Sequence, residues 1–317
     1  MLYLSVCIRS YDSMARLNAD IVQNDRLAQY RIGMEYYLGN NIRQSPEEAF
    51  RWMYKAARNG HPDANYVLGE MYAYGTGPEQ SVEKAVECLR RAAELSHPQA
   101  KYKLGLLSHA GIGMDQSDET AAEYWTSAAG DGCETAMFAL GLLYESGSGV
   151  PLDRKKAFDL FLAAAHRGLT AAKCRVGQMY EDGIGTEVSY PDALRWFREA
   201  ADEGDARSLF EIGWMTYFGM GCRQSEKESK RLVTASMLKG VFSILEREGV
   251  RANPYSQLRM GWLYDLGWGV EQSAYKAIAW YTGARIMGME KAKAFIDDIG
   301  RRNGITFDGC VGDSDSL

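Results

Sequence analysis

Pairs of serine and lysine are the residues in this sequence whose spacing most directly suggests chemistry. A serine followed by a lysine three residues later is the nucleophile signature of penicillin-recognising enzymes. The sequence has three such pairs: Ser81/Lys84, Ser236/Lys239 and Ser273/Lys276. It has neither the S-D-N nor the K-T-G motif that accompanies this signature, and it lacks GxSxG, P-loop and HExxH motifs. The sequence therefore predicts no catalytic residue.

Histidine and cysteine side chains could hold a metal ion if their spacing suited one. Of the four histidines, His61 and His97 are 36 residues apart, which is the period of an internal repeat. Repetition therefore explains these two better than metal ligation does. The six cysteines share no spacing and form no CxxC pair, which favours free thiols in a reducing compartment over a disulfide framework. We expect neither a metal nor a cofactor.

Composition limits the classes of partner. The formal net charge is −6 and the isoelectric point is near 5.4, so we expect no nucleic-acid binding, which needs clustered basic surface. No apolar run approaches the roughly 18 residues of a membrane-spanning helix. The short apolar start, residues 1–7, lacks the basic leading region of a secretory signal. We expect a cytoplasmic protein, or a periplasmic one if a preceding signal has been removed.

Glycine spacing reveals an internal repeat. The 33 glycines include a series spaced by 36 residues, with one further member 48 residues after the sixth. We call these residues the anchor glycines: Gly33, Gly69, Gly105, Gly141, Gly177, Gly213 and Gly261. The longer last step inserts 12 residues after the sixth repeat, and we expect a longer helix or an extra loop there. A fixed period of this length indicates a repeat protein.

Each anchor glycine lies within a predicted first helix. Apolar or aromatic residues stand three and one positions before it, as Tyr66 and Leu68 do before Gly69, and a ring often stands three positions after it. Glycine inside a helix costs roughly 0.5–1 kcal/mol relative to alanine, so its recurrence predicts close backbone approach by a packed neighbour. A G-x-G pair follows six and eight residues after the anchor and predicts the turn that ends the helix.

A second helix is predicted after each turn. Good N-cap residues stand twelve positions after every anchor glycine: Ser45, Ser81, Ser117, Asp153, Ser189, Ser225 and Ser273. Bulkier residues stand nineteen positions after it: Trp52, Cys88, Tyr124, Leu160, Trp196, Leu232 and Trp280. Small residues, mostly alanines, flank this column, so we expect the two helices to pack closely and the rings to fill the space beside them.

The combined pattern, A-x-x-x-L-G-x-x-Y-x-x-G-x-G…S/D…A-x-x-W-x-x-x-A-A-x-x-G, resembles the Sel-1-like repeat, a relative of the tetratricopeptide repeat. The resemblance covers residues 28–292 and implies an all-α fold, a right-handed α-solenoid of about seven helix–turn–helix repeats of 36 residues. The sixth repeat departs from the pattern, and the insertion lies near residues 241–255. We expect residues 1–27 to form an N-terminal capping helix and residues 293–317 a C-terminal helix and flexible tail.

The predicted docking face lies on the concave side of the solenoid, which the first helices line. On a helical wheel the following residues lie opposite the packing columns, or add to the aromatic density of the last two repeats: Arg31, Met34, Leu38, Glu70, Tyr74, Lys103, Arg175, Gln178, Glu211, Trp214, Tyr217, Phe218, Arg259, Trp262 and Leu266. Clustered exposed aromatics such as Trp214 and Trp262 predict a binding hot spot. The alternative is that these rings fill an irregular join at the insertion.

The resemblance implies a non-enzymatic adaptor or scaffold that binds another protein, in bacteria often in host interaction, signalling or envelope processes. An immunity protein that neutralises a secreted toxin, such as a lipase, is a second interpretation, which an acidic and partly apolar groove would suit. A β-lactamase-like enzyme ranks last. Relatives linked to β-lactam hydrolysis have regularly paired cysteines in each repeat, and this chain has none.

Overall fold

The computed structural model describes residues 25–251 and 253–305, and all regular secondary structure in these ranges is helical. The first helices along the chain are α2 (Arg26–Leu38), α3 (Pro46–Arg58), α4 (Pro62–Tyr74), α5 (Val82–Glu94), α6 (Pro98–Ala110), α7 (Asp118–Gly130), α8 (Glu134–Ser146) and α9 (Arg154–His166). The following ones are α10 (Thr170–Asp182), α11 (Tyr190–Asp202), α12 (Ala206–Phe218), α13 (Glu226–Leu238), α14 (Val241–Val250), α15 (Pro254–Leu266), α16 (Ala274–Ile286) and α17 (Lys291–Asn303).

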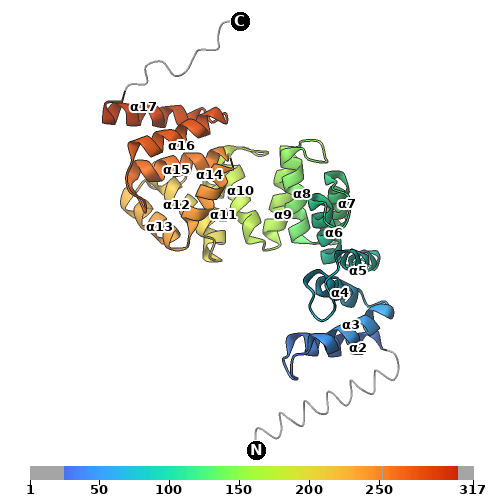
Figure 1. Ribbon diagram of the computed structural model, residues 1–317. Coiled ribbons are helices and arrows are strands. Elements are labelled where there is room, and N and C mark those ends of the chain that lie inside the picture. Colours follow the sequence, from blue (N-terminus) through green and yellow to red (C-terminus); the bar gives the residue numbers. More distant parts are fainter. Residues whose placement is uncertain (1–24, 252, 306–317) are drawn as a thin grey trace, which may run out of the picture. The chain divides into compact units, whose positions relative to one another are not determined.

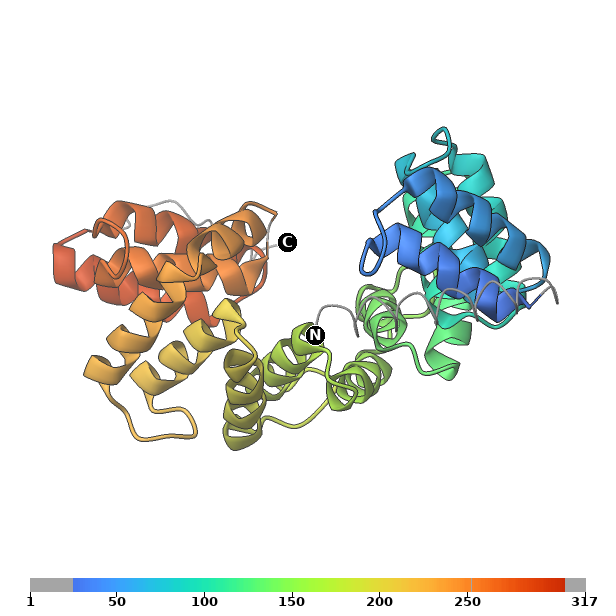
Figure 2. The same cartoon turned by 90° about the horizontal axis from the view of Figure 1, so that it is seen from below.

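The helices pack as consecutive hairpins, each with a first and a second helix (Figure 1). Within the units, second helices also pack on the first helix of the following hairpin, as α3 does on α4 and α11 does on α12. The predicted all-α fold of repeated helical hairpins is confirmed. The chain divides into two compact units, the first ending at Ala172 and the second beginning at Lys173. Figure 2 shows the hairpins of each unit from a second direction.

The second helices begin at the predicted N-cap residues. The side chain of each accepts a hydrogen bond from the backbone N–H three residues later, as Ser81 does from Lys84 and Ser273 from Lys276. Such a cap stabilises a helix by about 1 kcal/mol. The capping role accounts for two of the three serine–lysine pairs, because these serine hydroxyls bond the backbone of the lysine that follows.

Each anchor glycine receives a side chain from the second helix of its own hairpin. The side chain stands twenty positions after the glycine: Met53, Leu89, Trp125, Phe161, Phe197, Val233 and Tyr281. A Cβ added at Gly141 would lie 2.7 Å from Phe161 Cε1, and one at Gly177 would lie 2.7 Å from Phe197 Cε1. The close neighbour of each anchor glycine is thus mainly a side chain rather than backbone. This side chain stands one residue after the predicted column of bulkier residues that begins with Trp52.

The residues inserted after the sixth repeat form a separate helix, α14, rather than the longer helix or extra loop that the spacing suggested. Gly240 has φ 84°, a left-handed conformation that ends α13 and turns the chain. Val241 and Leu245 then lie on one side of the new helix and are fully buried. The inserted residues therefore form an additional packed helix, because Gly240 turns the chain and Val241 and Leu245 bury one side of α14.

The predictions for the chain ends fall partly outside the described residues. Most of the predicted N-terminal capping helix, residues 1–27, lies before residue 25, and the predicted tail lies mainly after residue 305. Within the described residues, α17 is capped at Gly304 in the left-handed conformation.

Candidate functional site

The predicted docking residues of the first unit lie on the surface of the first helices. Arg31, Leu38 and Tyr74 are exposed, and three further residues are half-buried: Met34, Glu70 and Lys103. Leu38 and Tyr74 occupy equivalent positions at the ends of α2 and α4, where their side chains are 53% and 70% exposed. Lys103 Nζ lies 3.4 Å from Glu70 Oε1 across adjacent repeats. These residues form a surface of apolar groups beside charges of both signs, which we call the first-helix face.

Four predicted docking residues of the second unit are buried, and their prediction as exposed groups is wrong. Glu211, Trp214, Arg259 and Trp262 are each at most 3% exposed. The reason is that side chains from α12, α15 and α17 meet one another, which a helical wheel of a single helix does not reveal. Trp214 and Trp262 cross edge to face with their ring centroids 5.1 Å apart. The interpretation of these rings as core-filling groups is therefore the correct one for these two tryptophans.

The remaining predicted aromatic and apolar residues of the second unit surround this core. Tyr217 is half-buried with its ring centroid 5.3 Å from that of Trp262, and Leu266 is half-buried against the same cluster. Phe218 is 36% exposed and packs on Trp214 at 4.6 Å. Of this group, Phe218 has the largest surface available to a ligand.

A network of charges, all buried except that of Glu248, joins α10, α12, α14 and α15. Glu211 accepts hydrogen bonds from Arg207 Nε at 2.7 Å and from Arg259 Nε at 2.9 Å. Arg259 Nη2 donates to Glu181 Oε1 at 2.7 Å, and its guanidinium lies 3.7 Å from the ring centroid of Trp214. Arg207 also pairs with Glu248 of α14. Because removing one partner of a buried ion pair leaves an uncompensated charge, this network ties the helices into one arrangement.

The three carboxylates nearest Arg259 differ in their pKa values. Burial opposes ionisation of Glu211, but Arg259 and Arg207 outweigh it and lower the pKa of this carboxyl. Burial raises the pKa of Glu181 in spite of Arg259, and it raises the pKa of Asp182 in spite of Lys291. The difference follows from the number of cations, because Glu211 accepts hydrogen bonds from two guanidinium groups and Glu181 from one.

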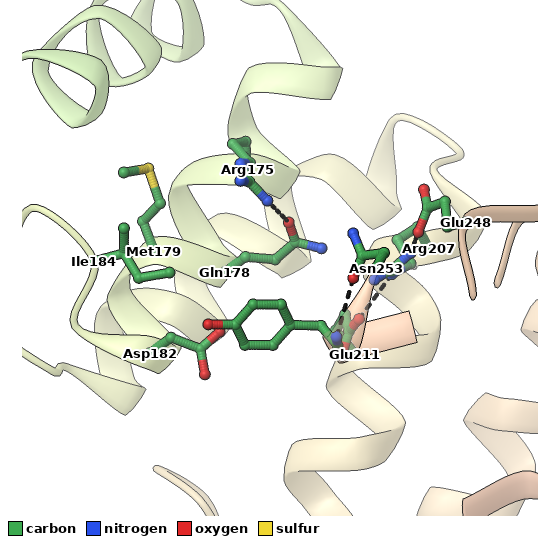
Figure 3. A pocket seen from close by; sticks show the side chains of 10 residues that line it. Arg175, Gln178, Met179, Asp182, Ile184, Arg207, Glu211, Glu248 and Asn253 are labelled. Carbon is green, nitrogen blue, oxygen red and sulfur yellow. Dashed lines mark hydrogen bonds and ion pairs between the residues drawn. The ribbon is translucent and has the colours of Figure 1, made fainter. Parts of the chain in front are cut away.

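A small polar cavity of about 70 Å³ lies beside this network (Figure 3). Arg175 and Gln178 line it from α10, with Arg175 Nη1 donating to Gln178 Oε1 at 3.0 Å. Arg207 and Glu248 line its other side. The cavity is the place where the predicted residues Arg175 and Gln178 meet the charged cluster.

A second, more apolar hollow lies in the same unit, and we call it the aromatic pocket. Its volume is about 230 Å³, and its lining is Glu181, Tyr190, Trp214, Phe218, Met220, Lys291 and Phe295. Sequence reasoning selected Trp214 and Phe218 but missed the others. Phe295 and Lys291 belong to α17, which lies beyond the repeat columns, so repeat spacing could not bring them to this site. The adjacent acidic pair Glu181-Asp182 was a visible signal, but the sequence showed no cleft for it.

The described cysteines are free thiols, and the histidines do not form a metal site. Cys88, Cys133, Cys174 and Cys222 are unbridged, and burial raises the pKa of Cys88 to about 11 and that of Cys174 to about 12. Within residues 25–251 and 253–305, no group of three His, Cys, Asp or Glu side chains could hold a metal ion. Across the same residues, no helix combines the length and the apolar character that crossing a membrane requires.

The fold defines an α-helical repeat protein, and comparison with known families identifies the repeat. A model of the Sel1 repeat matches residues 26–61, 62–97, 98–133, 135–169, 170–205 and 254–284. These segments make up most of the chain, which therefore belongs to the Sel1 repeat family. The unmatched stretch between residues 205 and 254 contains α12, α13 and α14, where the sequence departs from the repeat pattern.

Solved structures with this fold include two clear relatives. One is a protective antigen with an SLR fold, present in uropathogenic Escherichia coli strains; it is 27% identical, with 91% of this chain and 67% of that chain covered and a TM-score of 0.66. The other is a Sel1 repeat protein from Oxalobacter formigenes, 30% identical, with 68% and 89% covered and a TM-score of 0.63. Sel1 repeats are scaffolds for protein–protein interaction and are typically non-catalytic.

Other solved structures are less similar to this chain. An immunity protein from Pseudomonas aeruginosa is 22% identical, with 67% of this chain and 81% of that chain covered and a TM-score of 0.42. A likeness at this level carries no argument about the function of this chain. No curated protein matches the sequence.

Proposed function

We propose that the protein is a non-enzymatic scaffold that binds a partner protein on the first-helix face of its first unit. The observation that carries the proposal is the exposure of Tyr74 and Leu38 at equivalent positions of successive repeats. Large apolar side chains that recur at one register on a scaffold surface are candidates for binding hot spots. Leu142 of α8, 44% exposed one position after its anchor glycine, is a further exposed apolar side chain on a first helix of the same unit.

Charges on the same face indicate the chemistry of the partner. Arg31 is exposed, and Glu70 and Lys103 form a half-buried pair between adjacent repeats. An apolar centre with charges of both signs at its edge is the usual anatomy of a protein interface. The face therefore suits a partner that presents an apolar anchor flanked by polar groups.

The test is to capture partners from native extract, identify them, and measure binding of a purified partner to the purified full chain. Replacing Leu38 and Tyr74 together by alanine is expected to weaken binding by about 5- to 30-fold, the loss typical of an interface hot spot. The matched control is Tyr54→Ala. Tyr54 is also an exposed tyrosine of the first unit, 48% exposed, but it lies on the second helix α3.

The outcomes separate the proposal from its rivals. Equal affinity of the double variant and the unchanged chain would remove the first-helix face as the docking surface. If the partner is a toxin whose activity the chain blocks, docking serves immunity. Turnover of the β-lactam nitrocefin by the purified chain would contradict the non-enzymatic part of the proposal.

A further inference from the structure

The aromatic pocket of the second unit is built to hold a single side chain. Its volume of about 230 Å³ is below the roughly 300–1,000 Å³ of sites for drug-sized ligands. Trp214, Phe218 and Phe295 form its aromatic wall, with ring centroids 4.6 Å apart for Trp214 and Phe218 and 5.9 Å apart for Phe218 and Phe295. Because Phe218 and Lys291 at its edge are both exposed, the pocket opens to the surface.

Glu181 lines the pocket, and one oxygen of its carboxylate has no hydrogen-bond partner among the residues that the structure describes. Glu181 is only 4% exposed, and its Oε1 accepts from Arg259 Nη2 at 2.7 Å. Its Oε2 is buried and makes no hydrogen bond to any residue of the ranges 25–251 and 253–305. An unsatisfied buried acceptor is costly, more so when it belongs to a charged group. A ligand that brings a hydrogen-bond donor into the pocket would remove that cost.

The carboxylate of Glu181 favours a donor that is also a cation. Asp182 and Glu211 lie near it with the cations Arg259 and Lys291. Arg207, Arg175 and Glu248 complete a cluster with as many cations as carboxylates, so the preference for a cation comes from the unbonded oxygen of Glu181 itself. Lys291 does not fill the pocket with its own ammonium group, because its Nζ pairs with Asp182 at 3.3 Å and lies over the ring of Tyr255.

We propose that the aromatic pocket binds a lysine side chain of a partner protein, with the ammonium group bonded to Glu181 Oε2 and the methylenes against the rings. Aromatic faces attract ammonium groups, and the stem of lysine packs well on apolar surface. Trp214 already holds one cation in this way, since the guanidinium of Arg259 lies 3.7 Å from its ring centroid. The pocket lies in the second unit, so its test does not depend on the first-helix face.

The experiment titrates the full chain, labelled with [¹³C-methyl]methionine, with three probes and follows the methyl signal of Met220, assigned through Met220→Leu. The probes are n-butylammonium, its neutral analogue butan-1-ol, and a tripeptide with blocked ends and a central lysine. We expect saturable shifts of Met220 with n-butylammonium and with the lysine peptide, and at least about tenfold weaker binding of butan-1-ol, which lacks the charge.

Two variants and a control localise the effect. Glu181→Gln is expected to remove the preference for the ammonium probe over the alcohol. Phe218→Leu, which keeps an apolar side chain but removes the ring, is expected to weaken ammonium binding by about fivefold. Phe242→Leu is the control, because Phe242 packs on Tyr264 away from the pocket and should leave binding unchanged.

Several results would overturn the proposal. Equal affinity for the alcohol and the ammonium would show an apolar pocket without cation recognition, and an absence of saturable binding would show no site. Binding of free n-butylammonium without the lysine peptide would exclude a partner side chain. If Glu181→Gln fails to fold, the comparison of probes in the unchanged chain and in Phe218→Leu still tests whether the pocket recognises the ammonium group.

Discussion

His61 and His97 occupy the N-cap positions of α4 and α6, where serine, threonine, aspartate or asparagine is the usual residue. The Nδ1 atom of each ring accepts a hydrogen bond from the backbone N–H three residues later. The rings also stack on those of Tyr30 and Tyr66. Burial lowers the pKa of both imidazoles, in spite of the attraction of Asp63. A protonated Nδ1 cannot accept a hydrogen bond, so these caps require the neutral ring.

Because of these caps, we expect the free energy of unfolding to fall as the pH is lowered below about 7. The pKa of each histidine is lower in the folded chain than the unfolded value of about 6.5. Between the two values the unfolded chain binds more protons, so stability declines as the pH falls through the unfolded pKa and levels off below the folded one. Urea unfolding at several pH values measures this decline.

Replacing His61 and His97 together by asparagine keeps a capping side chain and removes the titration. The decline with pH should be shallower in this variant than in the unchanged chain. His166→Asn is the control, since His166 lies in the last turn of α9 and caps no helix start. An unaltered pH dependence in the double variant would refute the assignment.

A column of glutamines performs a capping task that we did not predict. Gln44, Gln80, Gln116, Gln224 and Gln272 each stand eleven residues after an anchor glycine, and each side-chain amide donates to a carbonyl seven residues earlier. These bonds satisfy carbonyl groups that the end of the first helix leaves without a partner. The signal was present in the sequence as the recurrence of one residue type at one position.

At the scale of elements, the hairpin depends on the fit between its anchor glycine and one side chain of the second helix. Gly141 lies against Phe161, which is fully buried. The absence of a side chain at position 141 lets the ring lie directly on the first helix. The cost of glycine in a helix, roughly 0.5–1 kcal/mol, is thus offset by packing.

Gly141→Ala is expected to destabilise the chain by about 1–2 kcal/mol, because overpacking costs about 1–3 kcal/mol and the gain in helix propensity recovers only part of it. Urea unfolding measures the change. The control is Gly130→Ala in α7, where an added Cβ meets nothing within 4 Å. That substitution should leave stability unchanged or raise it by up to about 1 kcal/mol. A stabilising effect at Gly141 as well would show that the ring can move aside.

At the scale of the whole molecule, local contacts between neighbouring helices account for the repeated fold, and the second unit adds contacts over long separations in the sequence. Arg259 of α15 bonds Glu211 of α12 and Glu181 of α10, which are 48 and 78 residues away. Lys291 of α17 reaches Asp182 over 109 residues. The unit is therefore held by more than the stacking of adjacent hairpins.

Arg259→Leu is expected to lower the stability of the second unit by about 3–5 kcal/mol, because it leaves the buried carboxylates Glu211 and Glu181 without this partner. Hydrogen exchange of the amides of α10, α12 and α15 measures the effect. Arg231→Leu is the control, because Arg231 forms an exposed pair with Glu228 and should change little. Equal protection in both variants would show that the network does not support the unit.

The sequence by itself determined the features that depend on contacts close along the chain. Its period predicted the helical hairpins, the serines and Asp153 predicted the starts of the second helices, and the anchor glycines predicted close packing. These features can be predicted from the sequence because each depends on residues within one repeat.

Only the tertiary structure decided which side chains remain available to a partner. Trp214, Trp262, Glu211 and Arg259 occupy the same columns as exposed residues of the first unit, and the sequence assigned them to the same docking face. They are buried because side chains from α10, α12, α15 and α17 meet in the second unit. Burial depends on neighbours that are distant in sequence, and a repeat pattern describes only the positions within each repeat.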